Sequence, residues 1–330
     1  MATNAAIFGC AGTTLSAPEH AFFADAQPWA FILFARNLDT PDQIRKLCAD
    51  LRESVGRNAP ILIDQEGGRV ARLRAPRWRA WLPPMEQMAN VSPDNARQAM
   101  VLRYRLIAHE LHALGIDVNC APMLDVPTPD AHQIITNRCY GTVPDTVAEM
   151  GRACSEGLLA GGVLPIIKHI PGHGRGSSDS HFELPVVDTD AETLDRVDFE
   201  PFRRLSDLPM AMTAHIVYTA FDPAACATVS STMIDIIRDS IGFDGLLMTD
   251  DLSMKALKGS FAERTSASLR AGCDVVLHCN GDMDEMRQIM SSVATLSGDA
   301  MARATRAENM RKAPQPFDVA GADSLFASLL

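Results

Sequence analysis

The stretch "LPIIKHI" (Leu164–Ile170) is an apolar run of strand length with two polar side chains, Lys168 and His169, close to its end. Runs of this composition are typical of strands buried on both faces, as in a parallel sheet. The same pattern, an apolar run that stops at glycine, a polar residue or a charge, occurs eight times along the chain. The predicted strands are Ala5–Gly9, Ala30–Arg36, Pro60–Glu66, Ile116–Pro122, Leu164–Ile170, Pro209–His215, Gly245–Asp251 and Cys273–Asn280.

Segments with helical patterning lie between these runs, and two of them carry clear start signals. "TPDQIRKL" puts Thr40 at an N-cap position with Pro41 after it, and "SPDNARQA" does the same with Ser92 and Pro93. The predicted helices are Pro41–Val55, Pro93–Leu114, Asp145–Ala160, Ala191–Leu205, Ser231–Ile241, Phe261–Ala271 and Asp284–Leu296.

Strands that alternate with helices indicate an α/β fold. Eight strand-then-helix units within 330 residues predict a single-domain TIM (β/α)₈ barrel over residues 1–330, with a short C-terminal tail from about residue 311. A doubly wound open sheet is the competing fold for the same pattern.

Composition narrows the class of partner and the compartment. The net charge of −11 disfavours a nucleic acid, whose binders normally carry a basic surface. Eight cysteines without a C-x-x-C pair indicate a reducing compartment, and neither a disulfide framework nor a zinc knuckle. The chain shows no signal-peptide pattern and no apolar run long enough to span a membrane. We therefore expect a cytoplasmic monomer that binds neither nucleic acid nor membrane.

A barrel of this kind places its catalytic groups at the carboxyl ends of the strands and in the loops that follow. Polar side chains gather at these positions in the sequence, so we expect the active site on that face. They are Asp64, Gln65, Glu66, Asn119, Asp125, Lys168, His169, His215, Asp250, Asp251, His278 and Asn280. Segment 69–90, rich in arginine and tryptophan, either stacks against a sugar or covers the rim of the barrel.

The segment "KHIPGHGRGSSDSH" (Lys168–His181) mixes histidines, glycines, a proline and an aspartate in a way that core packing rarely needs. Its glycines resemble a phosphate cradle, but such a cradle should open a helix. His169, His173, Asp179 and His181 could also bind zinc or iron. The His-x-His of barrel metallohydrolases is absent from the first strand end, however. The favoured interpretation is a loop over residues 170–184 that carries a reactive tip and can close.

The triplet Asp179-Ser180-His181 has a more specific use within that loop. Residues two apart in an extended segment point to the same side, so the Asp179 carboxylate can reach one ring nitrogen of His181. Such a carboxylate orients the ring and raises its proton affinity. The histidine could then donate a proton to a leaving oxygen and later take one from water. A surface turn with a local hydrogen bond is the alternative.

"MTDDLSM" puts two adjacent carboxylates at the end of the seventh predicted strand. Asp250 or Asp251 should project into the mouth of the barrel, where an aspartate can attack an anomeric carbon and form a covalent glycosyl-enzyme. The other interpretation is that one of the two acids caps a helix together with Ser253.

Four motifs together carry a resemblance to a known family. "LIDQEGGRVARL", "NRCYG", "KHIPGHG…DSH" and "TDDLSM" resemble motifs of the family-3 glycoside hydrolases, specifically of the bacterial β-N-acetylglucosaminidases of peptidoglycan recycling. The resemblance covers nearly the whole chain. The last two motifs are specific in combination, whereas "DQEGGR" is shared more widely, and Asn137 stands where some relatives have an acid.

The resemblance implies a retaining exo-β-N-acetylglucosaminidase that needs no cofactor and no metal. Its substrate would be the terminal non-reducing β-linked N-acetylglucosamine of muropeptides derived from peptidoglycan. By motif position, Asp250 would be the nucleophile, His181 the general acid/base, and Asp179 the partner of His181. The hydroxyls of the sugar would be held by Asp64, Arg72, Arg138, Lys168 and His169. A β-glucosidase-type member of the family, a metal-dependent barrel hydrolase and a catalytically silent sugar-binding barrel stay open as alternatives.

Overall fold

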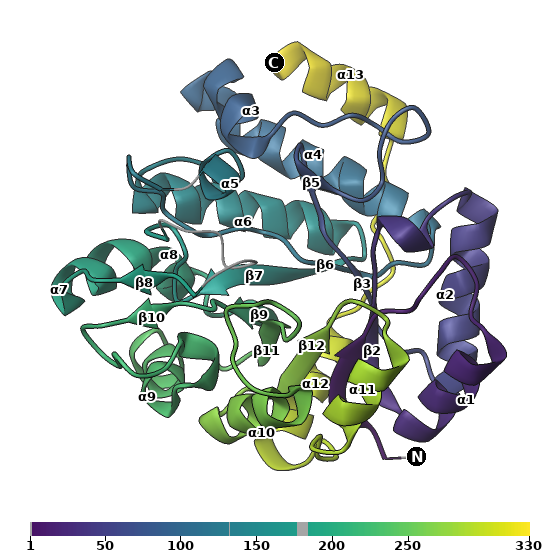
Figure 1. The fold of residues 1–330 in the computed structure, drawn as a ribbon. Helices are drawn as coiled ribbons and strands as arrows, with labels where there is room; N and C mark the ends of the chain where they lie inside the picture. Colours follow the sequence, from purple (N-terminus) through teal and green to yellow (C-terminus); the bar gives the residue numbers. More distant parts are fainter. Residues whose placement is uncertain (1, 132, 177–183) are drawn as a thin grey trace.

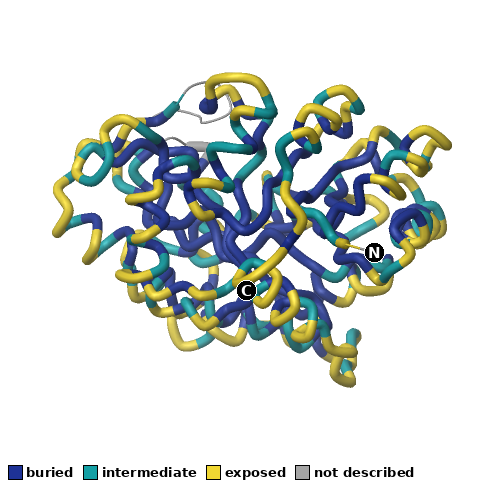
Figure 2. The backbone as a smooth tube through the Cα atoms, turned by 90° about the horizontal axis from the view of Figure 1, so that it is seen from below, coloured by how far each residue is buried: buried dark blue, intermediate teal, exposed yellow. Residues whose placement is uncertain are grey.

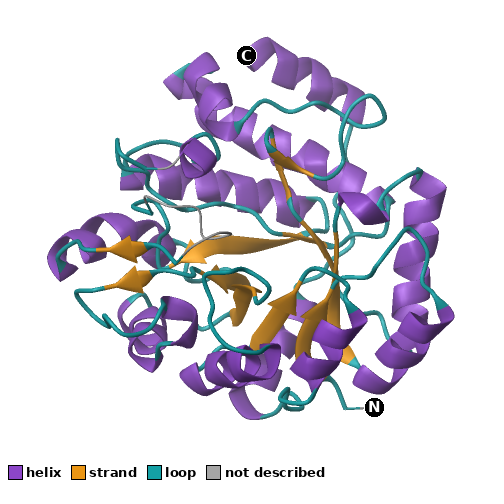
Figure 3. Ribbon diagram, in the orientation of Figure 1, coloured by secondary structure: helices purple, strands orange, loops and turns teal. Residues whose placement is uncertain are grey.

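The computed structural model describes residues 2–131, 133–176 and 184–330. Within them, the eight predicted strands form one closed barrel of parallel strands with helices around it (Figures 1 and 3). Each barrel strand pairs with the next one along the chain, and β1 pairs with β12 to close the ring. The barrel strands are β1 (Asn4–Phe8), β2 (Pro28–Leu33), β3 (Ile61–Ile63), β6 (Val118–Asn119), β7 (Leu164–Ile170), β9 (Met210–Thr213), β11 (Leu246–Asp251) and β12 (Val275–His278).

The register of the closing pair confirms the barrel and rules out the open sheet. Ala6, Ile7 and Phe8 of β1 lie opposite Val276, Leu277 and His278 of β12. All seven residues of β7 are buried, as the near-continuous apolar run predicts for a strand with side chains on both faces. Figure 2 shows the buried backbone at the centre of the molecule and the exposed segments around it.

β7 and β11 end at the predicted residues, whereas the third predicted strand ends early. The third predicted strand divides into β3 and a short strand β4 (Gln65–Gly67), which pairs antiparallel with β5 (Val70–Ala71). The cause is the side chain of Asn119, whose Oδ1 accepts from the Gln65 N–H and whose Nδ2 donates to the Gln65 carbonyl, both at 3.0 Å. The Asn119 amide therefore satisfies the backbone of Gln65, and the chain leaves the barrel there.

Helices cover the outside of the barrel, and one of the two predicted N-caps is confirmed. The Thr40 hydroxyl accepts from the Gln43 N–H at 3.2 Å, whereas Ser92 makes no such bond. The helices are α1 (Ala17–Ala26), α2 (Pro41–Val55), α3 (Pro84–Asn90), α4 (Pro93–Ala113), α5 (Gln133–Thr136), α6 (Pro144–Ala160), α7 (Ala191–Thr193), α8 (Glu200–Arg204), α9 (Ser231–Asp235), α10 (Phe261–Ala271), α11 (Met283–Met290), α12 (Gly298–Asn309) and α13 (Val319–Leu329).

Three predicted helices are wrong in part. The helix predicted over Ala191–Leu205 is interrupted by a π-helical turn at Leu194–Asp198, and Pro201 has no N–H with which to continue the α-helical ladder. The helix predicted over Ser231–Ile241 changes to a π-helical turn at Ile236–Ser240. The last one begins at Met283, where the Asp282 carboxylate accepts from the next free N–H groups, and it ends at Met290.

The segment predicted as a C-terminal tail contains helix α13, which lies beside α4 (Figure 1). Phe326 of α13 is 2% exposed and packs edge-on against Trp81, with ring centroids 5.6 Å apart. The Arg79 guanidinium lies 4.6 Å from the Trp81 ring centroid and 5.0 Å from that of Phe326. This part of the arginine-rich and tryptophan-rich segment therefore packs against α13, as the rim-covering alternative predicts. Among the described residues, no helix has both the length and the apolarity that crossing a membrane requires.

Candidate active site

A cavity of about 310 Å³ opens at the carboxyl ends of the barrel strands. Six of the predicted site residues line it together: Asp64, Arg72, Arg138, Lys168, His169 and Asp250. The other two, Asp179 and His181, lie outside the described residues. Apolar side chains complete the wall, among them Phe34, Ile135, Met212, Met254 and Leu277. The structure thus brings a charged floor and an apolar wall into one cavity of the size expected for a small-molecule site.

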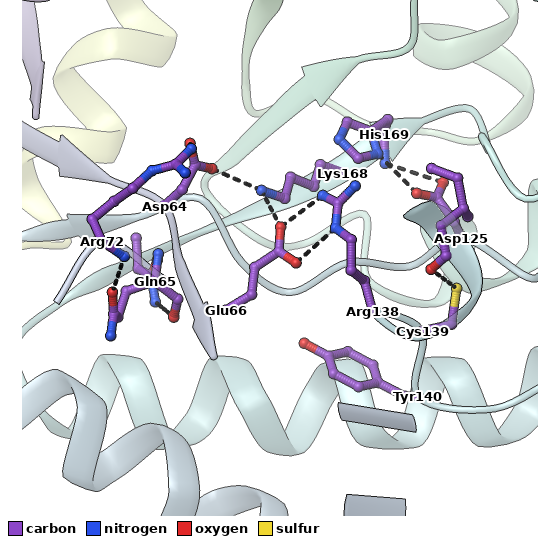
Figure 4. A network of polar contacts seen from close by, with 12 residues as sticks. Asp64, Gln65, Glu66, Arg72, Asp125, Arg138, Cys139, Tyr140, Lys168 and His169 are labelled. Carbon is purple, nitrogen blue, oxygen red and sulfur yellow. Dashed lines mark hydrogen bonds and ion pairs between the residues drawn. The ribbon is translucent and has the colours of Figure 1, made fainter. Parts of the chain in front are cut away.

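Lys168 is the centre of the charged floor (Figure 4). Its side chain is 2% exposed, and its ammonium donates to Asp64 Oδ1 at 2.9 Å and contacts Glu66 Oε1 at 2.6 Å. The Arg72 guanidinium donates to the other oxygen of Asp64 at 3.0 Å. Burial alone would lower the pKa of Lys168, but Asp64 and Glu66 outweigh it and raise the pKa. Lys168 is therefore a fixed cation at neutral pH.

Glu66 joins this group to Arg138 through a bidentate ion pair. Arg138 Nε donates to Glu66 Oε2 at 2.9 Å, and its terminal nitrogen donates to Oε1 at 2.7 Å. Burial would raise the pKa of Glu66, but Arg138 and Lys168 outweigh it and lower the pKa to about 2. Asp64 behaves in the same way: burial would raise its pKa, but Lys168 and Arg72 outweigh burial and lower the pKa. Three cations and two anions thus form one ion-paired group, and all of them except Glu66 line the cavity.

His169 is held by the fully buried carboxylate of Asp125. Its Nδ1 lies 2.8 Å from Asp125 Oδ2, and because a carboxylate accepts, Nδ1 carries the proton in this contact. The other oxygen of Asp125 accepts from the backbone N–H groups of His169 and His173, at 3.2 and 2.6 Å. Burial raises the pKa of Asp125, but the two histidines outweigh it and lower the pKa. Asp125 therefore fixes the His169 ring and the start of the glycine-rich loop.

The two acids at the end of β11 have different surroundings. Asp251 Oδ2 accepts from the Ser253 hydroxyl at 2.5 Å, and its Oδ1 accepts from the N–H groups of Ser253 and Cys279 at 3.0 and 3.2 Å. Asp250 Oδ1 accepts from the N–H of Asp251 at 2.7 Å. Asp251 thus caps a turn with Ser253, but the helix that the alternative interpretation predicts does not begin here, because the next helix, α10, begins only at Phe261.

Glycines in the loop after β7 allow close packing against the neighbouring backbone. A Cβ on Gly174 would lie 1.9 Å from the Val126 carbonyl oxygen, and Gly172 has a φ of +144° with Asp198 packed against it. The glycines therefore have a packing role here, and a helix that could form a phosphate cradle does not follow among the described residues. No three His, Cys, Asp or Glu side chains in the described part of the chain gather closely enough to hold a metal ion.

Several residues of the site were not assigned a role from the sequence. Glu66 and Asp125 were recognised only as polar groups near strand ends, yet they orient Arg138, Lys168 and His169. The sequence signal that could have indicated their roles is their position, since each follows a buried strand by a few residues. His278, at the end of β12, is buried against Phe8 and Phe261 and is not among the cavity-lining residues described.

Curated relatives match most of the chain. A protein named "Beta-hexosaminidase" from Nitrosomonas eutropha is 35% identical over 292 residues, which cover 86% of this chain and 82% of the relative. Another protein of that name, from Alkalilimnicola ehrlichii, is 37% identical over 284 residues, which cover 83% of this chain and 80% of the relative.

Solved structures share the whole fold. NagZ from Neisseria gonorrhoeae, in complex with N-trifluoroacetyl-D-glucosamine, superposes with a TM-score of 0.88 at 29% identity over 100% of this chain and 98% of the other. A family 3 β-N-acetylglucosaminidase from Paenibacillus sp. gives a TM-score of 0.88 at 27% identity over 98% of this chain, which spans 66% of that longer protein. Residues 14–310 match the model of the glycosyl hydrolase family 3 N-terminal domain, and the chain belongs to that family.

Proposed function

We propose that this glycoside hydrolase is a retaining exo-β-N-acetylglucosaminidase that acts on fragments of peptidoglycan. The observation that carries the proposal is Asp250, at the end of β11, which lines one cavity together with the ion-paired side chains of Asp64, Lys168 and Arg138. A cavity of about 310 Å³ suits one terminal sugar rather than a run of sugars. The curated relatives named "Beta-hexosaminidase" support a 2-acetamido sugar in that position.

In the proposed mechanism, Asp250 attacks the anomeric carbon while His181 gives its proton to the glycosidic oxygen. The aglycone leaves as an alcohol, and the sugar stays bound to Asp250 as an ester. His181 then takes a proton from water as the water oxygen attacks the same carbon and the Asp250 carboxylate leaves. Two inversions at that carbon retain the configuration. Asp179 favours the imidazolium form, which His181 has before the first step and regains in the second.

Binding of the sugar falls to the residues that resemble the family's sugar-holding positions. Asp64 accepts hydrogen bonds from hydroxyls, whereas Arg72, Arg138 and Lys168 donate to them. His169 presents the nitrogen that Asp125 does not contact, and Asp125 fixes the orientation of the ring. The ion pairs within this group hold each side chain in place before the sugar arrives, which lowers the entropic cost of binding.

The state of the cysteine thiols is evidence about the cellular compartment of the enzyme. The structure describes all eight cysteines, and each is a buried free thiol. This supports a reducing environment, and we place the enzyme in the cytoplasm on that basis. Its substrate would then be fragments of cell wall that have entered the cell rather than the intact wall.

A substrate comparison tests the proposed function directly. We expect nitrophenyl β-N-acetylglucosaminide to be hydrolysed with a kcat/KM at least about 100-fold above that of nitrophenyl β-glucoside, because a site that binds the acetamido group leaves polar groups unpaired without it. Initial rates with the two substrates give the ratio, and NMR of the first-formed sugar gives the anomer. A ratio near one would favour a β-glucosidase, and an α-anomer product would exclude retention.

The role of His181 is tested by the leaving group. Replacing His181 with alanine should lower kcat/KM for an N-acetylglucosaminide with an alkyl or sugar leaving group about 10³-fold, because that group needs a proton. A nitrophenolate needs little protonation, so its first step should lose far less. Steady-state rates with both substrates give the two losses. Equal losses for both leaving groups would remove His181 from the acid role.

A further inference from the structure

His215, two residues past the end of β9, is a buried titratable group that the proposed mechanism does not use. Its exposed fraction is 0%, and it is not among the cavity-lining residues described. Both ring nitrogens have partners. Nδ1 lies 2.7 Å from Thr228 Oγ1, and Nε2 lies 3.1 Å from the backbone carbonyl oxygen of Asp251.

These partners define the tautomer of His215. A carbonyl oxygen can only accept, so Nε2 carries the proton and donates to Asp251. Nδ1 of the neutral ring is then an acceptor for the hydroxyl of Thr228. That hydroxyl also lies 3.2 Å from the Ala214 carbonyl oxygen, but Nδ1 is the nearer acceptor, at 2.7 Å, and receives the proton. Because the Thr228 hydroxyl donates to Nδ1, it accepts from the Thr213 hydroxyl, whose Oγ1 lies 2.8 Å from Thr228 Oγ1. Burial lowers the pKa of His215 in spite of the nearby Asp250 and Asp251, which agrees with a neutral ring.

Asp251 connects this hydrogen-bonded chain to Asp250. The Asp251 N–H donates to Asp250 Oδ1 at 2.7 Å, while the Asp251 carbonyl accepts from His215. The Asp251 carboxylate is held separately by Ser253 and Cys279. The backbone of Asp251 is thus held on the β12 side by the Leu252 N–H, which donates to the Leu277 carbonyl at 2.9 Å, and on the β9 side by His215, and its N–H presents one defined direction to Asp250.

The backbone ladder does not supply this constraint on the β9 side. The backbone pairing of β9 with β11 begins with Leu246 opposite Met210 and ends with Met248 opposite Met212. Asp250 lies two residues beyond that point. The bond from His215 to Asp251 therefore links the two segments through a side chain after their backbone pairing has ended.

We propose that His215 is a positioning residue for Asp250: its Nε2-protonated tautomer holds the Asp251 carbonyl and thereby the backbone torsions of Asp251, whose N–H in the preceding peptide group orients the Asp250 carboxylate toward the cavity. The inference rests on the proposed function, in which Asp250 attacks the anomeric carbon. An attacking atom displaced by about 1 Å can lose about 100-fold in rate, so the effect belongs to the chemical step rather than to sugar binding.

Two replacements of His215 separate the hydrogen bond from the bulk of the ring. His215→Leu removes the donor to Asp251, whereas His215→Gln can place an amide N–H near the position of Nε2. We expect His215→Leu to lower kcat for nitrophenyl β-N-acetylglucosaminide about 100-fold and His215→Gln to recover about tenfold of that loss. The inhibition constant of free N-acetylglucosamine should change less than about twofold in both variants.

His278→Leu is the matched control, because it removes an equally buried imidazole near Asp251 whose ring contacts Phe8, Phe261 and Glu285 but makes no hydrogen bond to the Asp251 carbonyl. We expect this variant to keep a kcat within about threefold of the wild type. A wild-type kcat in His215→Leu, or an inhibition constant that rises as much as kcat falls, would overturn the proposal.

Thr228→Val and NMR keep the proposal testable if His215→Leu does not fold. Thr228→Val leaves the imidazole in place but removes the donor to Nδ1, and we expect kcat to fall about tenfold; an unchanged kcat would contradict us. ¹⁵N-histidine spectra at pH 7, assigned by difference from His215→Gln, should show a protonated Nε2 and a bare Nδ1. The other tautomer or an imidazolium would overturn the proposal.

An inactive wild type, or an active Asp250→Asn, would refute the proposed function instead.

Discussion

Replacing Asp250 with asparagine should lower kcat for nitrophenyl β-N-acetylglucosaminide at least about 10⁴-fold. An amide is too weak a nucleophile to form the glycosyl ester, and an activated leaving group does not remove the need for that attack. Steady-state rates give the loss. Mass spectrometry after treatment with a fluorinated glycosyl inactivator should find the label on the wild-type peptide that contains Asp250 and find no label on the variant.

Asp42→Asn is the matched control for this replacement, because it makes the same chemical change in a side chain of α2 that is 92% exposed. It should retain wild-type activity. Both variants should unfold at the wild-type temperature within a few degrees, so that lost activity reports on chemistry. Label on a peptide without Asp250, or a loss of less than tenfold in Asp250→Asn, would assign the nucleophile to another residue.

Replacing Glu66 with glutamine should lower the free energy of unfolding by about 3 kcal/mol at pH 7. The charges of Arg138 and Lys168 remain buried after the change, with Asp64 beside Lys168 and the more distant Asp125 left to compensate them. Chemical denaturation of the two proteins measures the difference. Glu156→Gln is the matched control, since it breaks an ion pair with Arg97 in which both side chains are more than 40% exposed. It should cost less than about 1 kcal/mol.

The same variant has a defined dependence on pH. The pKa of Glu66 is lowered from 4.5 to about 2 in the folded chain, so its contribution to stability is complete above the ordinary pKa. That contribution is lost as the pH falls from about 5 to about 2. We therefore expect the stability difference between wild type and Glu66→Gln to shrink across that window. Two denaturation curves that shift in parallel between pH 5 and pH 2.5 would contradict this prediction.

The barrel was predictable because its strands are buried on both faces. Burial on both faces requires a nearly continuous apolar run, and runs such as Leu164–Ile170 can be recognised without any knowledge of their neighbours. Helices α2 and α10 were also predicted with their observed bounds, because each has an amphipathic pattern and a residue such as Thr40 or Ser260 that caps its first turn.

Other helices were missed because their pattern is weak. Helix α1 begins with a complete capping box formed by Ser16 and Glu19, the first and last residues of "SAPE". Its apolar residues, however, do not form a clear stripe along one face. Helix α13 buries little besides Ala322 and Phe326, and Phe326 needs Trp81 as its partner. No local pattern can reveal a contact between residues so distant in the chain.

The site was predictable in its position but not in its connections. Topology places Lys168 and Asp250 on one face of the barrel, and the family resemblance adds Arg72 and Arg138. The roles of Glu66 and Asp125 depend on contacts across 72 and 44 residues of chain. Whether a carboxylate near a strand end reaches an arginine that far away depends on loop geometry, and a single sequence does not contain that information.

The seam between β1 and β12 has a consequence for synthesis. Ala6 lies opposite Val276, which leaves the ribosome 270 residues later. At about 5–20 residues per second, β1 therefore waits about 15–50 s for its second neighbour. During that time the nascent chain exposes unpaired strand edges, so truncated products should depend on chaperones and should aggregate more readily than the full-length chain.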